Sequence, residues 1–226
     1  NGYARETNPK LKTQDIVNFP HVESAGTATA FSVPSIFSFT PRGDFSPTDA
    51  KYTENLLDLL QQTGYEILWK ENDNGCKGVC QRVPNVEMDL KDQRFCDGTY
   101  CRDEILLDGL EEYLANIKGE HAFIVLHTIG SHGPTYYRRY PPEFKKFTPT
   151  CDTEEIQTCT QEQIINTYDN TILYTDHIVS SVIDILKKFP HYESGLLYVS
   201  DHGESLGENG VYLHGLPYSI APKEQT

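Results

Sequence analysis

Apolar residues along the chain alternate between short uninterrupted runs and longer stretches in which they recur every three or four positions. Short runs bounded by Gly and polar residues are typical of buried strands, and the longer spacing is typical of amphipathic helices. We expect strands at residues 65–69, 122–127 and 195–199, a short strand at 16–19, and helices at 51–62, 103–118 and 160–189. This alternation predicts an α/β fold with a mainly parallel sheet sandwiched between helices.

A further helix is expected at residues 24–37, where small residues lead into an apolar run. Pro34 suits its first turn or a kink. The hydroxyls of Thr27 and Thr29 would then lie near the helix N-terminus, where free N–H groups and the helix dipole favour an anion. From the residues alone, a simple helix cap by Ser24 or Thr27 is the better interpretation.

The composition is that of a globular domain, with 226 residues, 38% hydrophobic and 23% charged. No apolar run approaches the roughly 20 residues of a membrane helix, and no repeat or linker interrupts the pattern, so we expect a single soluble domain over residues 1–226. The net charge of −14 argues against a general nucleic-acid binder and against attraction to an anionic membrane. An anionic substrate would therefore need local cations or metal ions.

One stretch, residues 136–149, is basic and aromatic on this acidic chain. It could meet a phosphorylated, lipid-like surface. It could equally be a loop that is packed by its own tyrosines, and the sequence leaves both interpretations open.

The six cysteines form three close pairs, which predicts three local disulfides and an oxidising compartment such as the periplasm. The alternative, a structural zinc site built from the first two pairs, is disfavoured because their spacing does not match a C-x2-C ribbon. The expected pairs are Cys76 with Cys80, Cys96 with Cys101, and Cys151 with Cys159.

Chemistry-bearing residues follow two of the predicted strands. Asp201 and His202 come directly after residues 195–199 and are followed by glycines, and His214 lies twelve residues later. Ligand sites in α/β sheets lie beyond the C-terminal ends of strands, so this is a candidate metal or phosphate site, although a structural Asp–His turn is an equal alternative. The strand at 122–127 also delivers histidines, His127 and His132, into a Gly-rich loop.

Lys77 lies in another loop that follows a predicted strand and that a cysteine pair would brace. It is a candidate contact for an anion, and the alternative is an ordinary solvated lysine.

Several motifs occur together and in order along the whole chain, and together they resemble the bacterial phosphoethanolamine transferases of the alkaline phosphatase and sulfatase superfamily. That group includes the lipid A modifying enzymes and the mobile colistin-resistance enzymes. The motifs are Asn1-Gly-Tyr, Glu6-Thr-Asn-Pro9, Gly26-Thr-Ala-Thr-Ala30, Gly75-Cys-Lys-Gly78, Ser131-His-Gly-Pro134 and Ser200-Asp-His-Gly-Glu-Ser-Leu-Gly-Glu-Asn-Gly210.

The resemblance implies an alkaline phosphatase-like fold and roles for particular residues. Thr29 matches the nucleophile, which with Asp201 and His202 would bind the catalytic zinc. His132 and His214 match histidines that contact the phosphoryl group or a second zinc. Lys77 and, less directly, Asp73 match positions that line the substrate pocket, whereas His127 receives no role.

Two departures from the family pattern matter. The family has a further zinc ligand, a Glu shortly before Asn-Gly-Tyr, and this chain begins at Asn1; Glu6 lies on the wrong side of that motif to replace it. Many relatives also have a cysteine pair that flanks the nucleophile, where Ala25 and Ser35 stand here. Because family members carry N-terminal membrane helices, we expect the chain to be the periplasmic catalytic domain of a larger inner-membrane protein.

The resemblance implies a zinc-dependent transferase that moves phosphoethanolamine from phosphatidylethanolamine, through Thr29, to lipid A or another lipopolysaccharide acceptor. The expected consequence is polymyxin and colistin resistance in a Gram-negative cell, from a protein that we expect to be a monomer. A hydrolase of the same superfamily is one alternative, although Ser32-Val-Pro-Ser-Ile36 lacks the Arg of a sulfatase motif. A non-catalytic envelope binding module is the other, and the intact set of candidate residues argues against it.

Overall fold

The computed structural model describes residues 5–226, so the Asn1-Gly-Tyr part of the motif set lies outside the described residues. Its centre is a parallel sheet in the order β2-β1-β3, built from β1 (Glu66–Glu71), β2 (Asn85–Glu87) and β3 (Ala122–His127). β1 and β3 pair along their whole lengths, from Glu66 opposite Ala122 to Glu71 opposite His127. Both strands therefore end side by side, at the edge where an α/β sheet places its ligands.

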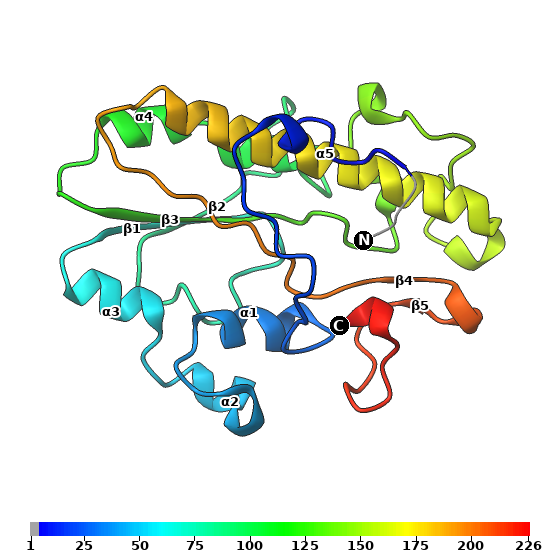
Figure 1. The fold of residues 1–226 in the computed structure, drawn as a ribbon, viewed down its shortest axis with the longest axis horizontal. Helices are drawn as coiled ribbons and strands as arrows, with labels where there is room; N and C mark the ends of the chain where they lie inside the picture. Colours follow the sequence, from blue (N-terminus) through cyan, green and yellow to red (C-terminus); the bar gives the residue numbers. More distant parts are fainter. Residues whose placement is uncertain (1–4) are drawn as a thin grey trace.

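Helices cover both faces of this sheet (Figure 1), which confirms the predicted α/β architecture. One face carries α1 (Thr29–Phe37), α2 (Pro47–Ala50) and α3 (Leu56–Gln62), and the other carries α4 (Leu110–Ala115) and α5 (Gln161–Lys187). On the first face Trp69 is completely buried among Val33, Leu57 and Ile67. On the second face Leu110, Leu114 and Ile185 pack with Ile124 and Leu126 of β3.

The helices α3 and α5 each begin directly after a polar N-cap residue. α3 begins after Asn55, which forms a capping box with Asp58, and α5 begins after Thr160, which forms one with Gln163. Each box satisfies N–H groups that the first turn cannot use internally. The stretch 103–118 is not one helix, because Gly109 adopts a left-handed φ of 72° between a 3-10 turn and α4.

The cap predicted for α1 is wrong, because its N-cap residue is Ala28 and no side chain caps it. The Thr27 hydroxyl instead donates to the Leu216 carbonyl at 2.6 Å, and the Ser24 hydroxyl donates to the Gly26 carbonyl. Pro34 lies in the interior of the helix. The α1 N-terminus therefore keeps free backbone donors beside Thr29.

Two predicted strands are absent. Residues 16–19 and 195–199 have no regular secondary structure and pair with no strand of the described structure, and Leu197 is 81% exposed. An apolar run becomes a strand only when a neighbour supplies hydrogen bonds, and these two runs have none. A two-stranded hairpin, β4 (Ser205–Leu206) with β5 (Tyr212–Leu213), follows the second run.

The three predicted disulfides are present, Cys76–Cys80, Cys96–Cys101 and Cys151–Cys159. They use all six cysteines, so the alternative of a cysteine zinc site is excluded. Between residues 5 and 226, no helix has the length and apolarity that a membrane crossing requires.

The basic stretch at 136–149 is a packed loop rather than an exposed patch. Tyr136, Arg139 and Tyr140 are buried, and Arg138 and Lys145 pair with acidic side chains. Of the two interpretations that the sequence left open, the structure supports the loop packed by its tyrosines.

Candidate active site

The start of α1, the loop after β3 and the segment around the β4–β5 hairpin bring five of the predicted residues together. The Thr29 hydroxyl lies 3.3 Å from Nε2 of His202, and Oδ2 of Asp201 lies 3.7 Å from the same nitrogen. His202 donates its Nδ1–H to the Gly203 carbonyl at 2.8 Å. That bond leaves Nε2 as the ring nitrogen with a free lone pair, turned toward Thr29.

His214 and His132 extend this group. The ring centres of His202 and His214 are 4.3 Å apart, and those of His214 and His132 are 4.9 Å apart. His132 donates Nδ1–H to the Gly133 carbonyl at 2.6 Å. Three imidazoles thus lie in series beside the nucleophile candidate, and each engages its Nδ1 in a hydrogen bond.

Glu204 orients His214 and was missed by the sequence reasoning. Its Oε2 accepts the Nδ1–H of His214 at 2.8 Å, and its Oε1 accepts the Tyr136 hydroxyl at 2.7 Å. The hydrogen bond to Glu204 raises the pKa of His214 although burial opposes it. Burial and the Glu204 charge raise the pKa of Tyr136, which keeps its hydroxyl a donor. A carboxylate behind a histidine fixes which ring nitrogen faces the site.

The donor set fits a metal ion such as zinc. Ligand atoms of His202, Glu204 and His214 lie within 4.8 Å of one another. In the described part of the chain, Oδ2 of Asp201 and Oδ1 of Asp73 are buried oxygens with no hydrogen-bond partner. A buried carboxylate oxygen without a partner is unfavourable unless a cation compensates it. Imidazole and carboxylate groups are among the ligands that zinc takes in proteins.

The ends of β1 and β3 form a buried polar cluster behind this group. His127 donates Nδ1–H to Glu71 at 2.8 Å, the Trp69 indole donates to the same carboxylate at 2.8 Å, and Nε2 of His127 lies 3.8 Å from Oδ2 of Asp73. Burial opposes both charges, yet their mutual hydrogen bond lowers the pKa of Glu71 and raises that of His127. The structure therefore gives His127 a partner that sequence reasoning did not find.

The loop that carries His132 is held from both sides. Asp103, which is 3% exposed, accepts the backbone N–H groups of Ile129 and Gly130, each at 2.9 Å. Arg139 is buried under the loop and donates Nε–H to the His132 carbonyl at 2.9 Å. Two buried charges thus fix the backbone on either side of the His132 ring.

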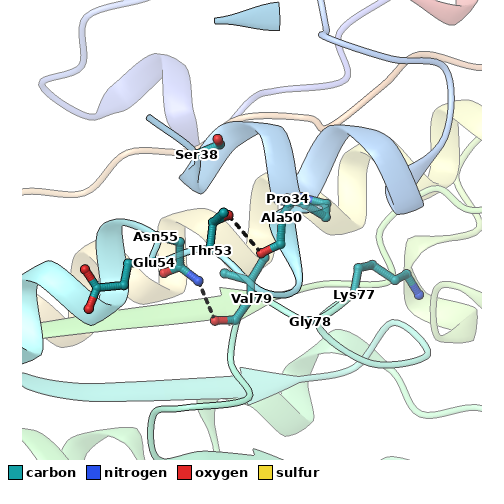
Figure 2. Close-up of a pocket in the computed structure, with 9 residues that line it drawn as sticks. All are labelled: Pro34, Ser38, Ala50, Thr53, Glu54, Asn55, Lys77, Gly78 and Val79. Atoms are coloured by element: carbon teal, nitrogen blue, oxygen red, sulfur yellow. Dashed lines mark hydrogen bonds between the residues drawn. The ribbon is translucent and has the colours of Figure 1, made fainter. Parts of the chain in front are cut away.

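Lys77 binds carbonyls of its own loop and lines a small cavity. The Lys77 ammonium donates to the carbonyls of Asp73 and Asn74, at 3.2 and 2.9 Å. Figure 2 shows it directed away from the other residues that line a cavity between α1, α2 and α3. That cavity holds about 10 Å³, which is room for about one water. It is too small for a lipid headgroup, so the histidine group is the better candidate site.

The chain is similar to known proteins over nearly its whole length. The model of the sulfatase family matches residues 1–226. The chain is 58% identical over 228 residues to the phosphoethanolamine transferase EptA of Salmonella typhimurium, an alignment that covers 99% of this chain and 41% of that protein. The chain therefore spans less than half the length of this relative.

Solved structures show the same fold. The soluble domain of lipooligosaccharide phosphoethanolamine transferase A from Neisseria meningitidis superposes with a TM-score of 0.93 at 51% identity, over 99% of this chain and 67% of that one. The periplasmic domain of EcEptC from Escherichia coli, solved as a complex with Zn, superposes with a TM-score of 0.75 at 26% identity, over 95% of this chain and 62% of that one.

Proposed function

The chain belongs to the sulfatase family, and from this premise we propose that it is the catalytic domain of a zinc-dependent phosphoethanolamine transferase whose nucleophile is Thr29. The observation that carries the proposal is the Thr29 hydroxyl at the α1 N-terminus, 3.3 Å from Nε2 of His202. The identity to EptA over nearly the whole chain supports the reaction class.

Thr29, Asp201 and His202 would hold the zinc, because the Thr29 hydroxyl and Oδ2 of Asp201 both lie near Nε2 of His202. That oxygen of Asp201 is buried and has no hydrogen-bond partner in the described structure. Bound zinc would lower the pKa of the Thr29 hydroxyl and polarise the phosphoryl group. His132 and His214 would bind a second zinc or the phosphoryl oxygens directly. Glu204 keeps His214 turned toward the site in either case.

The reaction proceeds in two displacements at phosphorus. In the first, Thr29 loses its hydroxyl proton to water and its oxygen attacks the phosphorus of phosphatidylethanolamine, while protonated His132 or His214 gives a proton to the diacylglycerol oxygen as its bond to phosphorus breaks. In the second, the same histidine takes a proton from a hydroxyl of the acceptor, whose oxygen attacks the phosphorus, and the bond to the Thr29 oxygen breaks. Backbone N–H groups at the α1 N-terminus stabilise the negative charge on the phosphoryl oxygens during both steps.

The acceptor that we propose is a phosphate or sugar hydroxyl of lipid A or another part of lipopolysaccharide, met by a protein anchored in the inner membrane with this domain in the periplasm. The neighbours named for lipooligosaccharide support this class of acceptor. Each added ethanolamine brings a positive charge to the envelope surface. Cationic polymyxins would then bind that surface more weakly, which gives resistance.

Mass spectrometry tests the proposal directly. The full-length protein, incubated with zinc and phosphatidylethanolamine, should carry one phosphoethanolamine on Thr29. The Thr29→Ala variant should carry none, whereas Thr27→Ala, which keeps Thr29, should still carry the adduct. An adduct in Thr29→Ala would refute the nucleophile assignment. Release of free phosphoethanolamine in the presence of lipid A, without lipid A modification, would indicate a hydrolase instead.

A further inference from the structure

Gln225 is a polar residue that is completely buried, at 0% exposure, yet each of its amide groups has a partner. Its Nε2 donates to the Ser205 hydroxyl at 3.1 Å and to the Leu213 carbonyl at 3.0 Å, and its Oε1 accepts the Leu216 N–H at 3.2 Å. Burying an amide is costly unless it is hydrogen-bonded. Here the amide is saturated, and every partner lies in the segment that carries the site histidines.

These hydrogen bonds join the two sides of the β4–β5 hairpin. Ser205 follows His202 by three residues, and Leu213 directly precedes His214 and adopts a left-handed φ of 63°. The Gln225 backbone carbonyl also accepts the Gly203 N–H at 3.3 Å. The C-terminus lies beside this hairpin in Figure 1. Gln225 thus connects the turn after His202 to the strand before His214.

The packing around Gly203 shows that this contact is close. A Cβ at Gly203 would lie 2.1 Å from the Glu224 carbonyl oxygen, so only glycine fits between His202 and the segment that carries Gln225. The Leu216 peptide extends the connection to the nucleophile loop, because its N–H is held by Gln225 and its carbonyl accepts the Thr27 hydroxyl at 2.6 Å.

We propose that Gln225 is a positioning residue that sets the spacing of His202 and His214 around the metal and phosphoryl site, an inference that rests on the proposed function. It touches neither histidine ring and acts through the backbone on either side of them. A single amide that donates to one segment and accepts from another fixes both at once, which a hydrophobic residue of the same size could not do.

The test compares Gln225→Met with Gln161→Met in the full-length protein. Methionine keeps the length of the side chain and removes every side-chain hydrogen bond, while the backbone bond from Gly203 remains. Gln161 is the matched control, because its Nε2 donates to the Leu206 carbonyl of the same hairpin at 3.0 Å but from the exposed surface. Zinc affinity is measured by competition with a chromogenic chelator, well below the melting temperature of every variant. We expect Gln225→Met to bind zinc about 10–100-fold more weakly, the size of effect seen when a second shell is lost, and Gln161→Met to match the wild type.

A third variant sharpens the result. In Gln225→Glu one carboxylate oxygen still accepts the Leu216 N–H, but the other faces the Leu213 carbonyl and repels it. It should therefore lose at least as much zinc affinity as Gln225→Met. If both variants melt at lower temperature but bind zinc as the wild type does, Gln225 is merely structural and the inference is wrong.

A metal-free measurement separates this inference from the proposed function. Imidazole 15N resonances of His202 and His214 report the tautomer and hydrogen bond of each ring without zinc. Gln225→Met should shift both sets, and unchanged resonances would overturn the inference. Failure of the wild-type protein to bind zinc would instead count against the proposed function, while the resonances would still decide whether Gln225 positions the rings.

Discussion

The buried carboxylate of Asp103 offers a sharp test of how the site is held in place. Its Oδ1 accepts the Ile129 N–H at 2.9 Å and the Asn72 amide at 2.8 Å, and its Oδ2 accepts the Gly130 N–H at 2.9 Å. Burial raises the pKa of Asp103, and these three donors oppose the shift. The Asp103→Asn variant has almost the same shape, so it changes hydrogen bonding and charge while leaving the packing intact.

The expected loss of stability in Asp103→Asn follows from the number of hydrogen bonds that the asparagine side chain can keep. Oδ1 of the new side chain can keep both of its donors, but its Nδ2 would face the Gly130 N–H, donor against donor. A lost hydrogen bond to a charged group costs about 1.5–3 kcal/mol. Removing a buried charge returns part of this cost. We therefore expect the free energy of unfolding to fall by about 2 kcal/mol.

The loss of transfer activity in Asp103→Asn should be larger than the loss of stability alone would cause. The loop that Asp103 holds carries His132, and a misplacement of about 1 Å in a reacting group can cost about a hundredfold in rate. We expect kcat to fall by tens of fold at a temperature where the variant is fully folded. Hydrogen exchange at the Gly130 amide should also become faster, because that group loses its acceptor.

Asp108→Asn is the matched control, because Asp108 pairs with Arg94 on the surface at 2.8 Å. Exposed pairs contribute about 0.2–1 kcal/mol. Urea unfolding, amide exchange and steady-state transfer rates are measured on both variants. If Asp103→Asn behaves like Asp108→Asn in all three assays, the loop does not depend on Asp103 and the reasoning is refuted.

Two further substitutions test other ion pairs. In the metal-free protein, Glu204→Gln should lower the pKa of His214, because the hydrogen bond to Glu204 is the main cause of its rise; an unchanged 15N titration would contradict the assigned orientation. The hydrogen bond from Arg82 holds the pKa of Asp58 below its usual range, so this pair stabilises the fold above the unfolded pKa and loses that effect as the pH falls through the folded pKa. Arg82→Met should thus cost about 1–2 kcal/mol near pH 7 and progressively less as the pH falls through the lowered pKa of Asp58, and a loss that does not shrink with falling pH in chemical denaturation would rule out the ion pair as the cause.

The sequence showed which apolar runs could form strands, but it did not show which of those runs find a neighbouring strand to pair with. The strands predicted at 65–69 and 122–127 are observed as β1 (Glu66–Glu71) and β3 (Ala122–His127), because they pair with each other and helices bury both faces. Residues 195–199 have the same apolar pattern, but no strand in the described range pairs with them. The break at Gly109 had a visible signal, since glycine inside a helical pattern favours a left-handed residue.

In the candidate site, too, some residues could be recognised from the sequence and others could not. The roles of Thr29, His132, Asp201, His202 and His214 came from the family resemblance; the residues alone placed Thr29 near a helix start and His132, Asp201 and His202 after predicted strands. Glu204 could have been suspected, since it stands two residues after His202. Asp103 and Gln225 could not, because each acts through hydrogen bonds to residues 9 or more positions away. No spacing rule in the sequence encodes such contacts.

The charges of the site explain why a chain of net charge −14 can act on phosphodiesters at all. Asp73 and Asp201 each have a buried oxygen without a partner in the described structure, and both raise the pKa of His214 through their charge. The nearby cations are already engaged, since Lys77 donates to loop carbonyls and Arg139 to the His132 carbonyl. A phosphodiester would be repelled by such a site unless positive charge is added to it. Buried carboxylates without partners would be unfavourable in a site that binds an anion alone, and they are favourable in one that binds a divalent cation together with the anion.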